Sequence, residues 1–388
     1  MIVPTAYAAG YAEARKQAPE IADLYLKHVC IGDPLADAAL ASMDAFGKEH
    51  SQRWIRVGIE QGLSALNDAP DAVRALFAEA DQQPVWFEPA MTLDGCRAFH
   101  RHAEMFLGAF VGAVLIEGFS TLISKSFCIT GRLVDQGVRR LKQNNLHLLE
   151  IFMPGGLDRR GDGWKLSVRI RLVHARVRQL LSQSPEWDTQ AWGTPISAAH
   201  IGYSAAAFSG LLLERAQALG VRLNEAETAS FMLAWRRSAQ LMGVPDALLA
   251  ENKADALRLL RIGSICEPPP ELESIIMANS LINCAPVVAG VVDIKARRAM
   301  SKRIYGISRA LIGDPLADAL QYPPHRAVGA LKLLQLKNRA DQLLNRMFPA
   351  IAQRRRAGQF KTMLGLSFSG NMDYKLAEHL YAEKDKPH

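Results

Sequence analysis

The chain has few cysteines, few aromatic residues and no block of like charge. Its five cysteines form no CxxC pair and their number is odd, so neither a zinc knuckle nor a disulfide framework is predicted. Their scatter favours a reducing compartment. Aromatic residues make up 7%, and the 46 Lys and Arg are interleaved with 39 Asp and Glu. Despite the net charge of +7, nucleic-acid binding is therefore not expected.

Neither a leader nor an uninterrupted membrane span is predicted. The amino terminus has no positive charge before its short apolar run, so we expect no secretory signal and a cytoplasmic protein. The apolar stretch from Phe106 to Ile123 is long enough to span a bilayer but carries Glu117 near its middle. We interpret it as a buried core helix. Contact with a membrane surface is left open but is not expected.

The repeating pattern along the chain is helical, and no strand-like alternation competes with it. The sequence predicts an all-α protein with one large helical domain. We expect a helical extension over 1–90, a helical core over 91–265, and a second helical extension over 266–388 that packs on the core.

A short phrase occurs twice in the chain. IGDPLADAAL at 31–40 returns as IGDPLADALQ at 312–321. The two copies are too short and too far apart to be a solenoid repeat. We predict that Asp33 and Asp314 each cap a helix whose first residue is the following proline.

The stretch from Trp164 to Leu181 places His174 between an apolar stripe and a row of arginines. On a helix, Arg171 and Arg178 lie within about 60° of His174. A haem needs an imidazole for its iron, apolar walls for its macrocycle and cations for its propionates. For a lone histidine, a structural role in a half-buried amphipathic helix is the commoner alternative. The apolar residues on the other side of His174 are Leu166, Ile170, Val173, Val177 and Leu181.

Two further parts of the chain carry side chains that suit catalysis. Arg140, Asn144 and His147 are spaced four and three apart, so they share one face of a helix predicted over 131–152. A solvated surface face is the alternative. Glu117, if buried, would have a raised pKa and serve as an acid or base, unless a cation pairs with it.

Four phrases in a fixed order resemble a known family. The phrases are HARVR at 174–178, WGTPIS at 192–197, FSGLLLERAQALGVRLNEAE at 208–227 and AWRRSAQLMGVP at 234–245. Together they resemble the helical domain shared by latex clearing proteins (rubber oxygenases) and the MpaB oxygenase of mycophenolic acid biosynthesis, over roughly residues 95–265. The resemblance implies an all-helical fold, one haem b, and the use of dioxygen to cleave a carbon–carbon double bond in an isoprenoid chain.

The resemblance also implies roles for individual residues. His174 matches the proximal haem ligand, and Arg140 and Asn144 match an arginine and a threonine near the oxygen-binding side. The lysine found between them in latex clearing proteins falls at Gln143. The catalytic glutamate of those enzymes falls at Ser124, and the nearest carboxylate is Glu117, seven residues earlier.

These observations predict a haem b-dependent oxygenase that acts with dioxygen on a small apolar substrate such as an isoprenoid. His174 would bind the iron, Arg171 and Arg178 the propionates, and Arg140, Asn144 and Glu117 would be catalytic. A helical protein that binds haem or a lipid without turnover is the main alternative, because the glutamate and lysine are missing. A non-haem di-metal bundle is disfavoured, since no Glu-x-x-His pair faces another.

Overall fold

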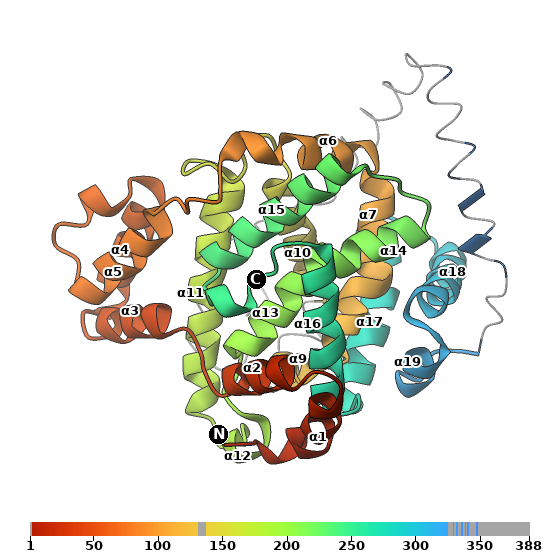
Figure 1. The fold of residues 1–388 in the computed structure, drawn as a ribbon, viewed down its shortest axis with the longest axis horizontal. Coiled ribbons are helices and arrows are strands. Elements are labelled where there is room, and N and C mark those ends of the chain that lie inside the picture. Colours follow the sequence, from red (N-terminus) through yellow and green to blue (C-terminus); the bar gives the residue numbers. More distant parts are fainter. Residues whose placement is uncertain are drawn as a thin grey trace.

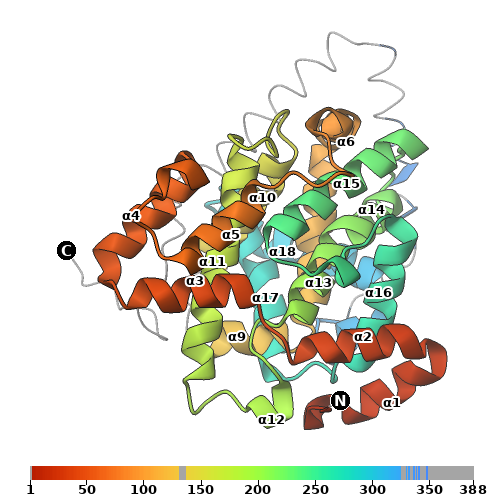
Figure 2. The ribbon, with the colours of Figure 1, turned by 60° about the vertical axis from the view of Figure 1, so that its left-hand side comes forward.

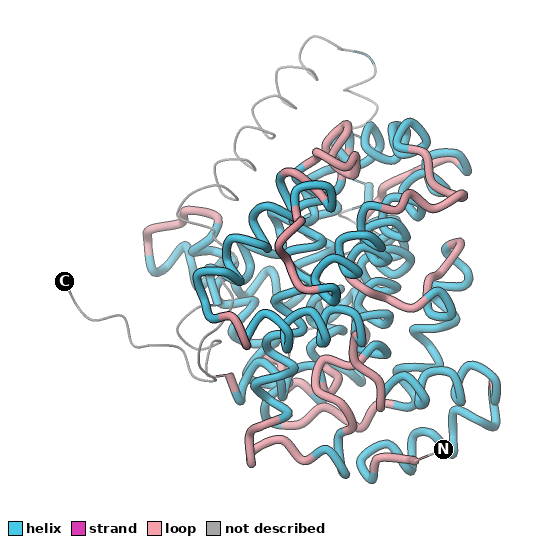
Figure 3. The backbone as a smooth tube through the Cα atoms, turned by 90° about the vertical axis from the view of Figure 1, so that its left-hand side faces the viewer, coloured by secondary structure: helices cyan, strands magenta, loops and turns pink. Residues whose placement is uncertain are grey.

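The chain folds into a stack of helices around one apolar core. The computed structural model describes residues 2–130 and 137–324, together with single positions between 329 and 347; the side chains of 137–140 fall outside it. All regular elements in this described part are helical (Figure 3). The prediction of an all-α protein with a single domain is therefore confirmed.

The N-terminal helices form two groups. Helices α1 and α2 pack against α13 and α16 of the core, whereas α3 lies against α11. Figure 1 shows α3, α4 and α5 projecting to one side of the molecule, and Figure 2 shows α3 crossing α11. The bounds are α1 (Ala8–Gln17), α2 (Pro19–Val29), α3 (Pro34–Asp44), α4 (Gly47–Glu60) and α5 (Asp71–Asp81), with 3-10 turns at Thr5–Tyr7, Leu63–Ala65 and Pro89–Thr92.

The central helices surround α13 and α15. Their bounds are α6 (Leu93–Arg101), α7 (Ala103–Ala109), α8 (Leu115–Phe119), α9 (Ile123–Ile129), α10 (Gly137–Ile151), α11 (Asp162–Ser182), α12 (Thr189–Trp192), α13 (Ala198–Ala206), α14 (Leu212–Ala218), α15 (Glu225–Leu241) and α16 (Lys253–Cys266), with a 3-10 turn at Asp246–Leu248. Helices α17 (Leu272–Val288), α18 (Ile294–Ile312) and α19 (Asp314–Ala319) follow.

The predicted apolar helix over 106–123 is not continuous. A π-helical segment, Phe110–Val114, joins α7 to α8, and a second one, Ala207–Leu211, joins α13 to α14. The two π segments contact each other, and Phe110 and Phe208 meet edge to face. Within the described residues, no single helix is long and apolar enough to cross a bilayer; one pair of segments, Pro89–Arg101 and Ala103–Phe119, passes by length and composition but is bent by 85°.

One apolar core runs through all three predicted parts of the chain. It extends from Tyr7 to Tyr322 and includes the stacked rings of Phe99, Phe152 and Phe231. Because the terminal helices contribute buried side chains to the same core as the central ones, their packing contributes to the stability of the whole. The three-part division itself stays a prediction.

The two Gly-Asp-Pro phrases begin helices in different ways. Asp33 is the N-cap of α3, and its carboxylate accepts a hydrogen bond from Ala36 N, as predicted. The prediction for Asp314 is wrong. Gly313, at φ 87°, is the N-cap of α19, and Asp314 lies one residue inside the helix without a capping bond. Its carboxylate pairs instead with Arg309 of α18.

Candidate functional site

Helices α10 and α11 pack side by side and place His174. The side chains of His147 on α10 and Ser167 on α11 meet, with Nε2 3.1 Å from Oγ. Position 140 lies two turns before His147 on α10, and His174 lies two turns after Ser167 on α11. That Arg140 and His174 belong to one site stays a prediction.

His174 has the properties of an unused ligand. Its Nδ1 atom is buried and has no hydrogen-bond partner among the described residues. Burial, together with the nearby charge of Arg178, lowers its pKa to about 4. The imidazole is therefore neutral at ordinary pH, which is the form that binds a metal. The alternative, a histidine bonded to a backbone carbonyl, is not supported by the described contacts.

Two small apolar clusters lie on either side of His174 and are separate from the main core. The first contains Leu166 and Ile170 of α11 with Leu146 of α10 and Met242, and Ile201 packs against it. The second contains residues on the C-terminal side of His174. The apolar stripe predicted for α11 therefore faces neighbouring helices at both ends of the His174 turn. The members of the second cluster are Val177, Leu181 and Trp187, with Val173, Trp192 and Ile196 among those packed against it.

The two arginines beside His174 bind carboxylates of the N-terminal region. Arg171 donates from Nε to Asp33 Oδ2 at 2.6 Å and from Nη2 to Asp33 Oδ1 at 3.1 Å. It also donates from Nη1 to Glu79 Oε2 at 2.6 Å. Arg178 donates from Nε to Asp37 Oδ1 at 2.9 Å. We call the Asp33–Arg171 and Asp37–Arg178 pairs the arginine clamp. Asp33 and Glu79 occupy Nε, Nη1 and Nη2 of Arg171, so the geometry gives no support to the prediction that Arg171 binds a propionate. Arg178 Nη2 is buried and has no hydrogen-bond partner among the described residues, and a propionate at Arg178 stays a prediction.

Two of the other motif phrases meet at the arginine clamp. Arg178 donates from Nη1 to the carbonyl oxygen of Ile196, in the WGTPIS phrase, at 2.5 Å. Gly243, in the AWRRSAQLMGVP phrase, has φ +83°, and a Cβ there would overlap Asp33 and Arg171. Three of the four phrases that carry the resemblance therefore meet around one turn of α11, although they are far apart in the sequence.

The backbone also ties the WGTPIS phrase to the segment before α3. Thr194 N donates to Val29 O at 3.0 Å, and Ala198 N donates to Ile31 O at 2.7 Å. Gly193 has φ +72°, and a Cβ there would lie 2.6 Å from the Val29 side chain. The N-terminal segment is thus held against the turn between α12 and α13.

The residues predicted on the opposite side of the site lie on α10. Arg140 is on this helix, but its side chain lies outside the described residues. Asn144 and Gln143 are half-buried. His147 is buried, and its burial and the nearby His174 lower its pKa to about 3. Asn144 and His147, three residues apart, share one face of α10, as predicted.

Glu117 is paired with a cation, the alternative that the sequence left open. Arg215 of α14 donates from Nε to Glu117 Oε1 at 2.8 Å and from Nη2 to Oε2 at 3.0 Å. Burial raises the pKa of Glu117 even though Arg215 opposes the shift. At the position matched to the family's glutamate, Ser124 Oγ lies 3.0 Å from Ser274 Oγ. No carboxylate takes that place.

A buried polar cluster was not predicted. His200 Nε2 lies 3.2 Å from Glu267 Oε1, and both side chains are 2% exposed. Tyr25 donates to Glu267 Oε1 at 2.7 Å, Leu122 N donates to Oε2 at 3.0 Å, and the Tyr7 hydroxyl lies 3.0 Å from His200 Nε2. The sequence offers no signal for it, because its members come from five separate segments and share no spacing.

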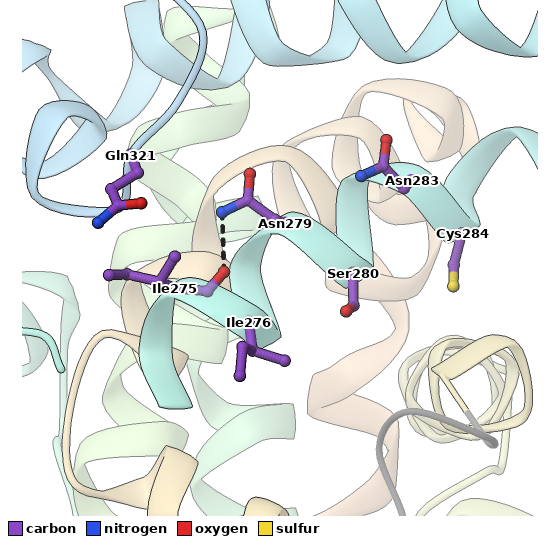
Figure 4. Close-up of a pocket in the computed structure, with 7 residues that line it drawn as sticks. All are labelled: Ile275, Ile276, Asn279, Ser280, Asn283, Cys284 and Gln321. Atoms are coloured by element: carbon purple, nitrogen blue, oxygen red, sulfur yellow. Dashed lines mark hydrogen bonds between the residues drawn. The ribbon is translucent and has the colours of Figure 1, made fainter. Parts of the chain in front are cut away.

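Two pockets lie away from His174. A pocket of about 580 Å³ is lined by one face of α17, with Asn279, Ser280, Asn283 and Cys284, and by Gln321 (Figure 4). Another, of about 860 Å³, lies beside Gly62 and Arg159. His174 lines neither of them. The described residues hold no group of three or more His, Cys, Asp or Glu side chains arranged for a metal ion; a haem iron, held through one histidine, does not require such a group.

Comparison with known proteins identifies the family. The chain is 28% identical over 185 residues to the rubber oxygenase of Streptomyces sp. (strain K30), an alignment that covers 46% of this chain and only 44% of that protein. Its fold matches a latex clearing protein in the closed state with a TM-score of 0.65 at 19% identity, over 87% of this chain and 91% of the other. Residues 97–336 match the model of the catalytic domain of ER-bound oxygenase mpaB/B' and rubber oxygenase. The chain therefore belongs to the family of oxygenases that share this catalytic domain.

Proposed function

We propose that the protein is a haem b-dependent oxygenase that acts with dioxygen on a small apolar substrate such as an isoprenoid. The observation that carries the proposal is His174: a neutral, largely buried imidazole whose Nδ1 has no partner among the described residues. It lies between two apolar clusters, on the helix that carries the family's HARVR phrase.

The residues present fit a haem on the proximal side. His174 would hold the iron, and Leu166, Ile170 and Val177 would contact the macrocycle. Bound haem supplies the redox chemistry by which dioxygen reacts with an alkene. Arg178 Nη2, which is buried and has no hydrogen-bond partner among the described residues, would donate to one propionate. Arg171 is held by Asp33 and Glu79, so the partner of the other propionate would come from another position.

The residues of α10 would act on the opposite side. Arg140 and Asn144, which match the arginine and threonine near the family's oxygen-binding side, would donate hydrogen bonds to dioxygen and orient it. The apolar helices α7 and α8, of which α8 carries Glu117, would line the path of the substrate and exclude water. Glu117, held by Arg215, would act as a base only after that pair opens.

The test is the visible spectrum of the purified protein and of apoprotein titrated with haemin. We expect a Soret band at one haem per chain that is lost in His174→Ala, whereas His100→Ala, on α6, keeps it. A folded wild-type protein that stays colourless after haemin addition would overturn the proposal.

A haem-binding or lipid-binding protein without turnover is the second candidate. Ser124 in place of the glutamate, and the capture of Glu117 by Arg215, favour it. Measurement of dioxygen uptake and carbonyl products with short isoprenoids separates the two candidates. Uptake with carbonyl products supports the oxygenase, and a haem-loaded protein that consumes no dioxygen with any apolar alkene supports the binding protein.

A further inference from the structure

The arginine clamp holds the turn of α11 that carries His174. Arg171 precedes His174 by three residues and Arg178 follows it by four, so both lie on the face of His174, one turn to either side. Their partners, Asp33 and Asp37, lie four residues apart at the start of α3. The His174 turn is therefore fixed at both ends by the same neighbouring segment.

Three of the four side chains of the clamp are buried: Arg171, Arg178 and Asp33 are 3%, 6% and 9% exposed, whereas Asp37 is 39% exposed. Such pairs contribute little net stability, because the cost of removing charges from water offsets their attraction. The two-point bond between Arg171 and Asp33 does, however, fix the relative orientation of the two groups, and Arg178 donates from Nε to both oxygens of Asp37. The clamp therefore acts mainly on position.

Two glycines bring the backbone close against the clamp. A Cβ at Gly32 would lie 2.6 Å from Arg178 Nε, so the backbone of the Gly-Asp-Pro phrase rests directly on the arginine. Gly243 closes the other side, against Asp33 and Arg171. Both glycines permit an approach that any larger residue would prevent.

The second copy of the Gly-Asp-Pro phrase, at 312–321, can be compared with the first. Asp314 and Asp318 hold Arg309 with Nη1 to Oδ1 distances of 3.0 and 2.7 Å, but their side chains are 77% and 69% exposed. Arg309 belongs to the preceding helix, α18, only five residues before Asp314. The same phrase thus binds arginine in both places, and only the first copy does so across a buried contact between distant segments.

We propose that Asp33 and Asp37 are positioning residues for His174: the N-terminal Gly-Asp-Pro segment, through the arginine clamp, sets the depth and angle at which the imidazole meets the haem iron. This segment lies outside residues 97–336, which match the family's catalytic domain. The site is therefore completed by a part of the chain beyond that domain. The inference rests on the proposed haem function.

The first test uses Asp33→Asn and Asp37→Asn. Asparagine caps a helix as well as aspartate does, so the start of α3 is kept while the ion pair is lost. The matched control is Asp44→Asn. It removes another ion pair between α3 and α11, the one between Asp44 and Arg176, in which the Asp44 side chain is 37% exposed. We expect haemin affinity to fall about tenfold or more in the clamp variants, with a changed ferric spin-state spectrum. We expect the control variant to keep the haemin affinity and the spin-state spectrum of the wild type.

A second measurement does not depend on haem. In the apoprotein we expect backbone amides of residues 170–178 to exchange hydrogen roughly tenfold faster in the clamp variants than in Asp44→Asn, because local opening of this turn becomes easier. If wild-type protein binds no haemin, the proposed function fails, and the exchange rates still decide whether the clamp holds α11.

The outcomes are distinct. Clamp variants whose haemin affinity, spin state and amide exchange match those of Asp44→Asn would overturn the inference. If Asp33→Asn does not fold by circular dichroism, Asp37→Asn decides, since its carboxylate is 39% exposed and its loss leaves the Asp33–Arg171 pair in place.

Discussion

Gly243 shows how a single residue can be required by two constraints at once. Its φ of +83° disfavours any side chain, and a Cβ would overlap the Asp33–Arg171 pair. Gly290 shares the first constraint, at φ +74°, but has open space around it. We expect Gly243→Ala to lower the free energy of unfolding by about 3 kcal/mol or more, and Gly290→Ala by about 1 kcal/mol.

Urea unfolding followed by circular dichroism measures both glycine variants. Equal losses in the two would mean that backbone conformation alone accounts for Gly243. The comparison would then contradict the close packing against the arginine clamp.

Glu267 makes stability depend on pH. Burial alone would raise its pKa, but attraction to His200 and hydrogen bonds from His200, Leu122 N and Tyr25 lower it below the ordinary value of 4.5. A carboxyl with a lowered folded pKa stabilises the protein above the unfolded pKa, and this contribution is lost as the pH falls through the folded pKa.

We therefore expect Glu267→Gln to be less stable than wild type at neutral pH, with a difference that shrinks as the pH falls below about 4.5. Urea unfolding at a series of pH values measures this. The control is Glu251→Gln, whose ion pair with Arg236 is largely exposed and whose effect should stay small at every pH. A difference for Glu267→Gln that is constant with pH would contradict the assigned pKa direction.

At the scale of single residues, the sequence predicts which side chains of α11 lie beside His174, but not which residues from distant segments contact them. The helical period of α11 places an imidazole between apolar side chains and arginines, and the structure has this arrangement. The partners of Arg171 lie 138 residues away for Asp33 and 92 for Glu79. A local pattern contains no information about such contacts, and the arginines were therefore assigned to propionates.

The end of a helix can be predicted from nearby residues where a side chain bonds to the free backbone groups of its first or last turn. The start of α15 is an example: Asn224 accepts from Glu227 N at 2.8 Å, and Glu227 accepts from Asn224 N at 3.0 Å, which is a complete capping box. Removal of the cap in Asn224→Ala should lower the free energy of unfolding by about 1 kcal/mol.

The matched variant for this cap is Glu225→Gln, in the same turn, which changes a charge near the helix start and should cost only a few tenths of a kcal/mol. Thermal unfolding of both variants gives the comparison. Equal effects would show that charge at the helix start, rather than the cap, is responsible.

Elements that depend on tertiary packing are less predictable. The chain around Phe110 and Phe208 reads as continuous helix, yet each stretch contains a π segment where the two helices meet. An extra residue per turn changes which side chains face the neighbour, and the cause lies in that neighbour. In the same way, Asp314 failed to cap α19 because the positive φ of Gly313 starts the helix one residue earlier.

At the scale of the molecule, the terminal helices belong to the same core as the family domain. Tyr7 and Tyr25 are fully buried and reach His200 and Glu267. We expect deletion of residues 2–30 to lower Tm by more than about 10 °C while a single unfolding transition remains, because much apolar surface is exposed at once.

Calorimetry measures this prediction. The control is Lys16→Ala, whose ion pair with Glu13 is exposed on α1 and should change Tm by about 1 °C or less. An unchanged Tm in the deletion, or two separate transitions in wild type, would show that the N-terminal helices are an independent unit.

The long separation between the two halves of the arginine clamp has a consequence for biosynthesis. The ribosome releases Asp33 long before Arg171, and Gly243, which seals the pair, emerges 72 residues after Arg171. Closing so long a loop is slow and becomes favourable only when most contacts of the core can form. The turn that bears His174 is thus assembled late in folding, after most of the chain has been translated, and a haem would meet its ligand only in a nearly complete protein.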